Sequence, residues 1–396
     1  MTEGRLAADI YAAADARLSE VDERVAAKYP GEPAGRQPVH TVYVPADKYA
    51  PDVVTRWGEQ ALAIFRQRGA ELGLTAEVGD RVAAKLATEP IEDLRIDFED
   101  GYGHPGDEAE DEMALSCGRS LTVATPFVGI RFKSFERATR RRGIRTLDLF
   151  LSGLLENGDL PPGFVVTLPK VTAVEQVAVA ADVLAALEKA HGLPERALRF
   201  EVQIETSQSI LDTDGTVAVP RIIQAAAGRC SGLHYGTYDY SAGLGIAAAY
   251  QSMDHPAADF AKAFIQVSAA GTGVRLSDGS SNRLPVGDAV LDAWREHLRL
   301  VRRSLERGFY QGWDMHPHQL PTRFAATYAF FREGLPSAAA RLHDYATAAD
   351  SGVLDEPATA QALAAFLCRG LDCGALDESE LPLPRARLDA YARRIG

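Results

Sequence analysis

The stretch FEVQIETSQSI, residues 200–210, has the pattern of a buried strand that ends in a polar turn. Phenylalanine, valine and isoleucine alternate with three polar residues, as the two faces of a strand require. The small or polar residues TSQ at 206–208 then break the alternation and turn the chain. A carboxylate, that of Glu205, therefore stands at the point where the strand is expected to end.

Short apolar runs of the same kind recur along the chain and alternate with segments that have helical periodicity. The expected strands are HTVYVP (40–45), LRIDFE (94–99), FVGIRF (127–132), FVVTLP (164–169), RFEVQIE (199–205), GLHYGT (232–237), GVRLSD (273–278) and YQGWDM (310–315). Strands that alternate with helices predict a parallel sheet, and eight is the number that closes a TIM (β/α)8 barrel. An open, doubly wound sheet is the alternative.

Helical patterns flank this region at both ends. An N-terminal helical segment is expected in residues 1–36, where prolines and glycines follow an alanine-rich helix. The barrel is expected to occupy residues 37–320. A C-terminal helical extension or lid is expected in residues 321–396, because patterns such as TRFAATYAFFREG dominate there.

Composition narrows the classes of partner. The 396 residues carry a formal net charge of -13, so a field that repels phosphate groups disfavours nucleic acid and anionic membranes as partners. A carboxylate substrate would need a local positive site. The four cysteines form no C-x-x-C pair, which argues against structural zinc and suits a reducing cytoplasm. No signal peptide or membrane span is expected, and the predicted location is cytoplasmic.

Two carboxylates follow neighbouring strands. Glu205 ends one strand, and Asp239 follows the next in HYGTYDYSAGLG, where glycines allow a close loop. In a barrel both lie at the carboxyl ends of the strands, where active sites form. Neither motif contains a basic residue. Paired carboxylates of this kind suit Mg2+ or Mn2+, whereas a helix cap at Glu205 and a turn at Asp239 are the structural alternative.

A further acidic cluster, DFEDGYGHPGDEAEDE, spans residues 97–112. Its second half, 107–112, is expected to form the first turn of a helix, where acids complement the helix dipole. Asp97, Glu99 and Asp100 differ because they end a strand, and this position makes them candidates for the active site.

Basic and imidazole side chains offer weaker signals. Arg131 lies within the third strand and could clamp a carboxylate by paired hydrogen bonds. The arginine run at 140–142 suits a solvated surface, with contact to a polyphosphate tail as the alternative. His316 and His318 could chelate a metal on an extended strand, but the proline between them favours a rigid turn.

Several motifs, taken in order, resemble the HpcH/HpaI aldolase and citrate lyase beta-subunit superfamily. The resemblance covers residues 39–365 and departs at Lys133, Ser207 and Gln208, which differ from residues common in that superfamily. The motifs are VYVPADKY, IDFEDGYG, GIRF, LPKV, IETS, YGTYDYSAGLG, GWDMHPHQL and GVLDEPATAQA.

The resemblance implies roles for individual residues. Glu205 and Asp239 would bind the divalent ion, and Arg131 would anchor and activate the substrate. Asp355 would act as acid/base in a neighbouring subunit's site, although from the residues alone it could be a helix N-cap. Lys170 of the LPKV motif joins the expected substrate-binding residues.

Asp97, Glu99 and Asp100 are also expected to bind substrate, and could instead hold metal-bound water or orient Arg131. The expected function is a Mg2+-dependent carbon–carbon lyase or aldolase that acts through an enolate on a small carboxylic acid, either a 2-oxo acid or an acyl-CoA. A malate synthase-like condensing enzyme or thioesterase, and a catalytically silent metabolite-binding barrel, are the alternatives. A homo-oligomer, trimeric or hexameric, is expected because Asp355 would complete a neighbour's site.

Overall fold

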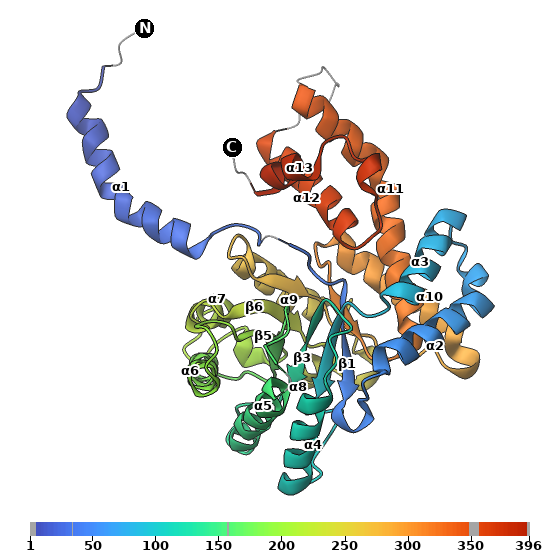
Figure 1. The fold of residues 1–396 in the computed structure, drawn as a ribbon. Helices are drawn as coiled ribbons and strands as arrows, with labels where there is room; N and C mark the ends of the chain where they lie inside the picture. Colours follow the sequence, from blue (N-terminus) through green and yellow to red (C-terminus); the bar gives the residue numbers. More distant parts are fainter. Residues whose placement is uncertain (1–4, 34, 157, 348–355, 394–396) are drawn as a thin grey trace.

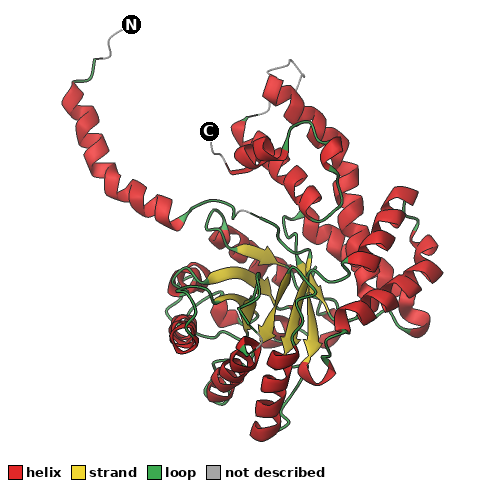
Figure 2. Cartoon of the chain, viewed as in Figure 1, coloured by secondary structure: helices red, strands yellow, loops and turns green. Residues whose placement is uncertain are grey.

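Eight parallel strands form a single sheet in the computed structural model, which describes residues 5–33, 35–156, 158–347 and 356–393 (Figures 1 and 2). Every strand expected from the sequence is present. The strands are β1 (His40–Pro45), β2 (Asp93–Asp97), β3 (Phe127–Arg131), β4 (Val165–Leu168), β5 (Arg199–Ile204), β6 (Cys230–Tyr235), β7 (Arg275–Ser277) and β8 (Gly312–Asp314).

The sheet closes into a barrel, which confirms the TIM-barrel prediction and makes the open-sheet alternative wrong. The strands lie in the order β7-β6-β5-β4-β3-β2-β1-β8, and all of the paired neighbours are parallel. A parallel bridge between Ser277 and Gln311 joins the two ends of this series. The Asp278 backbone N–H also donates to the Gln311 carbonyl oxygen at 2.8 Å.

Strand register brings polar residues of the first strands to one level of the barrel. Pro45 lies opposite Asp97, Asp97 opposite Arg131, and Arg131 opposite Thr167. A Cβ atom at Gly129 would lie 1.7 Å from the Val165 carbonyl oxygen, so glycine allows β4 to approach β3 closely. The carboxyl ends of β2, β3 and β4 are thereby held beside one another.

Helices surround the barrel, and the main hydrophobic core lies between them and the outward faces of the strands. Alternate strand residues such as Val42, Ile96, Ile130 and Val202 are fully buried there. The surrounding helices are α2 (Val53–Arg68), α3 (Ala76–Thr88), α4 (Asp107–Ser120), α5 (Arg140–Leu155), α6 (Val174–His191), α7 (Ala218–Ala225), α8 (Thr237–Gly243), α9 (Pro256–Ala269) and α10 (Val290–Glu306). The acidic start of α4 confirms the helix expected at 107–112.

The inward faces of several strands carry charged side chains. Arg95 on β2 donates to Glu201 on β5 through two nitrogen atoms, at 3.2 and 3.1 Å, and also pairs with Asp93. Thr167 on β4 donates to Glu201 at 2.6 Å. These groups are buried, so each charge inside the barrel requires a partner of opposite sign.

Four helices of the described residues flank the barrel in sequence. They are α1 (Ala8–Lys28), α11 (Leu320–Thr347), α12 (Pro357–Asp372) and α13 (Arg385–Arg393). Helix α11 begins beside the carboxyl end of β8 and packs against α3 and α10, and its last part lies with α1, α12 and α13 toward the amino ends of the strands. A cavity between α12 and the barrel is lined by Cys368 and Arg369 on one side and by Val39 and Tyr310, which precede β1 and β8, on the other. Figure 1 shows the same arrangement, with α11, α12 and α13 gathered at one end of the barrel. Among the described residues, no helix has the length and apolarity that crossing a membrane requires.

Candidate active site

The carboxyl ends of the strands enclose a cavity of about 380 Å3. It gathers Arg131, Glu205 and Asp239 with Asp97, the last residue of β2, and Asp100 of the following turn. Its lining consists of Tyr43, Pro45, Asp97, Asp100, Gly101, Arg131, Glu205, Gly236, Thr237, Tyr238, Asp239, Ser280, Trp313 and Met315. The place is the one that a TIM barrel uses for catalysis.

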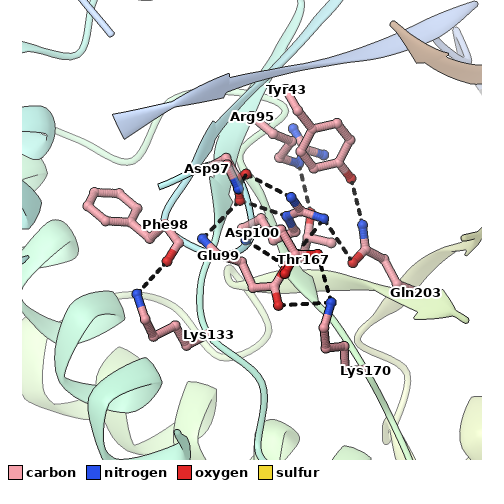
Figure 3. A network of polar contacts seen from close by, with 12 residues as sticks. Tyr43, Arg95, Asp97, Phe98, Glu99, Asp100, Lys133, Thr167, Lys170 and Gln203 are labelled. Carbon is pink, nitrogen blue, oxygen red and sulfur yellow. Dashed lines mark hydrogen bonds and ion pairs between the residues drawn. The ribbon is translucent and has the colours of Figure 1, made fainter. Parts of the chain in front are cut away.

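Arg131 is held by an acid of the chain itself. Its Nε and Nη2 atoms donate to the two carboxylate oxygens of Asp97, both at 2.7 Å. Figure 3 shows Asp97 in the same network of polar contacts as Glu99 and Gln203. The guanidinium carbon lies 4.7 Å from the centre of the Tyr43 ring. Burial opposes the charge, but Asp97 and Glu99 outweigh it and raise the pKa of Arg131. Asp97 therefore occupies two of the three guanidinium nitrogens of Arg131, Nε and Nη2. The third nitrogen, Nη1, lies 3.5 Å from Gln203 Oε1 and 3.6 Å from Glu99 Oε2.

Asp97 is fixed by the turn that follows β2. Its two oxygens accept the backbone N–H groups of Glu99 and Gly101, each at 3.0 Å. A Cβ atom at position 101 would lie 2.7 Å from Asp97 Oδ2, so glycine allows the turn to close against the carboxylate. Asp97 therefore orients Arg131 in this structure.

Glu205 is buried and points into the cavity from the end of β5. Its Oε1 atom accepts the backbone N–H of Lys170 at 2.7 Å. A Cβ atom at Gly236 would lie 2.4 Å from Glu205 Oε2, so this glycine leaves room for the carboxylate. The capping alternative for Glu205 is wrong, because Thr206 caps the following short helix by accepting the Ser209 N–H at 3.1 Å.

Asp239 lies in the first turn of α8, one element after β6, and its side chain is about half exposed. The glycine-rich sequence predicted a loop at this point, but α8 begins at Thr237, directly after Gly236. The Asp239 Oδ2 atom lies 3.3 Å from Lys170 Nζ. Both expected metal-binding carboxylates therefore contact Lys170, one through its backbone and the other through its side chain.

Lys170 supplies a positive charge that neither carboxylate motif contains. It follows β4, and its Nζ atom lies 2.8 Å from Asp100 and 3.0 Å from Glu99. Its backbone adopts a left-handed φ of 49°, which is uncommon for a residue other than glycine and is typical of functional sites. Burial lowers the pKa of Lys170, but the carboxylates of Glu205 and Glu99 outweigh burial and raise it.

The carboxylates around Lys170 differ in the direction in which their pKa values are shifted. Burial, reinforced by the nearby Asp239, raises the pKa of Glu205 to about 7, although Lys170 opposes the shift. Burial also raises the pKa of Glu99. For Asp100 burial is outweighed by the hydrogen bond from Lys170, and its pKa is lowered.

Other candidates lie away from the cavity. Lys133, where the chain departs from the resembled superfamily, is buried and donates to the Phe98 carbonyl and to Glu110, both at 2.7 Å. Its role in the structure is to join β3 to α4.

The histidines form the expected turn. His318 N–H donates to His316 Nδ1 at 3.1 Å within a short 3-10 helix. No cluster of three or more His, Cys, Asp or Glu side chains suited to a metal ion occurs in the described ranges. Asp355 lies outside the described residues, and the arginine run at 140–142 opens α5, with Arg142 paired to acids of α4.

The sequence reasoning missed several residues in or beside the cavity. Gln203 donates to the Tyr43 hydroxyl at 3.3 Å, and the Tyr43 and Trp313 rings lie 5.0 Å apart. Trp313 Nε1 and Thr237 Oγ1 are buried without a hydrogen-bond partner among the described residues. Strand alternation could have indicated Tyr43 and Gln203, because both lie on the inward face opposite the apolar residues.

One family model matches most of the chain. A family model described as "Domain of unknown function (DUF6986)" matches residues 18–395. No curated protein matches the sequence.

Three solved structures illustrate the likeness. A citrate lyase from Burkholderia xenovorans LB400 is 20% identical, with a TM-score of 0.62, over 90% of this chain and 98% of the other. Malate synthase from Haloferax volcanii is 16% identical, with a TM-score of 0.50, over 74% and 76%. The CitE protein of Mycobacterium tuberculosis, in complex with magnesium and acetoacetate, is 18% identical, with a TM-score of 0.46, over 76% and 92%. At such identities the first two similarities show a shared fold.

The raised pKa of Glu205 predicts a pH-dependent stability for the protein in EDTA. Its carboxyl group binds a proton more tightly when folded, with a pKa of about 7 against an ordinary 4.5. The resulting contribution to the free energy of unfolding is fully present below about pH 4.5. It decreases by an amount on the order of 3 kcal/mol as the pH rises through about 7. Urea unfolding of Glu205→Gln across this range should lack that loss. The exposed Glu195→Gln is the control, and equal slopes for both variants and wild type would contradict the prediction.

Proposed function

The chain belongs to the family described as a domain of unknown function (DUF6986), and we propose that it is a Mg2+-dependent carbon–carbon lyase or aldolase for a small carboxylic acid. One observation carries the proposal. Arg131, Glu205 and Asp239 meet at a single cavity at the carboxyl ends of the barrel strands. The shared fold with a protein named as a citrate lyase is consistent with this chemistry.

The donor set of the cavity fits a divalent cation. Carboxylates outnumber cationic groups around it, because Arg131 is paired with Asp97 and Lys170 with Glu99 and Asp100. Glu205 and Asp239 would hold the ion. Two carboxylate ligands leave positions for water and substrate oxygens, as Mg2+ sites commonly have. The raised pKa of Glu205, caused first by burial, is the expected sign of a carboxylate that lacks sufficient positive charge.

Bond cleavage or formation beside a carbonyl group passes through an enolate, and bound Mg2+ would supply Lewis-acid stabilisation of its negative charge. The chain's own residues orient the substrate. Asp97 fixes the plane of Arg131, whose Nη1 atom can then bind a carboxylate oxygen. The Trp313 indole N–H and the Thr237 hydroxyl are buried without a hydrogen-bond partner among the described residues, so both are available to substrate oxygens.

Lys170 is unsuited to the alternative chemistry of a Schiff-base aldolase. Such an enzyme needs a neutral amine as nucleophile, and that state requires a lowered pKa. Carboxylates around Lys170 raise its pKa instead and keep the ammonium charged. We assign Lys170 to holding Glu99, Asp100 and Asp239 in position.

The acid/base is proposed to come from a second copy of the chain. Asp355 is the candidate, and the end of α11 that precedes it and α12 that follows it both lie toward the amino ends of their own barrel. The cavity of the same chain opens at the carboxyl ends. A homo-oligomer in which Asp355 completes a neighbour's cavity would resolve this separation.

Removal of either carboxylate should abolish Mg2+ binding. We expect Glu205→Gln and Asp239→Asn each to show no binding heat in isothermal titration calorimetry while circular dichroism remains that of the wild type. Asp214→Asn is the matched control, because Asp214 lies in an exposed turn where it bonds Thr216 and Arg221. Unchanged affinity in either site variant would refute the metal site.

Enolate formation can be measured with simple substrates. With Mg2+ in D2O, we expect the protein to exchange the methyl protons of pyruvate, followed by proton NMR, or to release free CoA from acetyl-CoA and glyoxylate. The second result would favour the condensing alternative. Arg131→Lys should lower the rate of whichever of these two reactions is observed roughly 100-fold. An ammonium group cannot keep both the ion pair with Asp97 and a contact with the substrate.

The control for Arg131→Lys is Arg145→Lys on the surface of α5, where Arg145 pairs with Asp111. If the protein binds Mg2+ but shows neither proton exchange nor CoA release, that result would favour the catalytically silent metabolite-binding barrel instead.

Completion of the site by a neighbour predicts complementation between inactive variants. After subunit exchange, Asp355→Ala mixed with Glu205→Gln should recover about a quarter of wild-type activity, since random mixing gives that share of sites both intact residues. Glu205→Gln mixed with Asp239→Asn is the control, because both defects lie in the same barrel. If exchange is verified and the first mixture stays inactive, Asp355 does not act across subunits.

A further inference from the structure

Helix α1 buries no side chain against the described part of its own chain. None of its residues is buried, and Figures 1 and 2 show it extending away from the barrel. Its apolar side chains are open to solvent, with Tyr11 54%, Leu18 52% and Val25 48% exposed. An isolated helix of this length gains little stability in water without a packed face.

The apolar residues of α1 repeat with the spacing of a coiled coil. Tyr11, Leu18 and Val25 are seven residues apart, and Ala14 and Val21 fall three residues after the first two. These are the a and d positions of a heptad, which place one narrow apolar seam along the helix. A seam of this kind is buried when two such helices pack side by side.

The charged residues beside the seam specify what the partner helix must carry. Arg17 and Arg24 occupy g positions, and Asp15 and Asp22 occupy e positions. Among the described residues, none of these four side chains makes a hydrogen bond or an ion pair within its own chain. They are available to a second helix.

We infer that α1 pairs in parallel with α1 of a second copy of this chain. In a parallel pair, a g residue faces the e residue five positions later on the partner, so Arg17 of each helix meets Asp22 of the other. In an antiparallel pair g faces g and e faces e, which would oppose arginine to arginine and aspartate to aspartate. The charge pattern therefore selects both the partner and its direction.

The position of α1 leaves the candidate active site accessible. The segment after α1 joins the barrel near the amino ends of the strands, where Gly31 N–H donates to the Gly271 carbonyl at 2.9 Å and Glu32 lies 3.5 Å from Arg369. The cavity lies at the other end of the barrel. Pairing through α1 is thus a contact separate from the completion of a site by Asp355.

Disulfide cross-linking of the full-length protein tests this pairing. Ala14→Cys places a thiol in the seam, where a parallel pair brings the two copies of position 14 together. Ala16→Cys is the matched control, because position 16 lies at f on the outer face. The native cysteines, Cys117, Cys230, Cys368 and Cys373, are all buried, which limits background reaction.

Mild oxidation should link most chains of Ala14→Cys into pairs on a non-reducing denaturing gel, and few chains of Ala16→Cys. Charge exchange provides a second measurement. Arg17→Glu and Asp22→Arg should each weaken association through α1, ~5-fold at low salt, and a mixture of the two should restore it. Equal cross-linking at both positions, or no cross-link at position 14, would overturn the inference. So would unchanged association in both charge variants.

Discussion

The ion pair between Arg131 and Asp97 fixes the geometry of the candidate site. Both side chains are buried, and a charge removed from water is tolerated only when a partner satisfies it. Register places Arg131 of β3 directly opposite Asp97 of β2, and the turn after β2 holds the carboxylate through two backbone N–H groups. Any change in that register would leave a buried guanidinium without its counter-ion, so the pair ties the site to the sheet.

A second pair deeper in the barrel extends the same constraint. TIM barrels usually fill their interior with branched apolar residues, whereas here Arg95 and Glu201 pair across the interior. The apolar residues of the strands face outward to the helices and form the main core there. The charged interior therefore aligns strands β2 and β5, which do not pair as neighbours in the sheet.

Strand positions could be predicted from the sequence because alternation and turn residues are local signals. The gathering of Arg131, Glu205 and Asp239 followed from the rule that parallel strands end on one side. Other features depend on contacts between distant residues. Asp97 occupies two nitrogens of Arg131, and Lys170 approaches both the acids that follow β2 and Asp239 of α8. These contacts arise from side-chain directions that no local pattern encodes. The pairing of Lys133 with Glu110 was hidden for the same reason.

The balance of charge suggests an order of binding in the proposed reaction. Asp97 neutralises Arg131, and Glu99 and Asp100 together outweigh Lys170. Glu205 and Asp239 therefore add further negative charge to a partly enclosed cavity, and an anionic substrate entering it alone would be repelled. A divalent cation bound by those two carboxylates would reverse the local balance and also favour the ionised form of Glu205, whose pKa burial raises to about 7. The cation would then precede the carboxylate substrate, and Arg131 would bind that substrate through the edge that Asp97 leaves free.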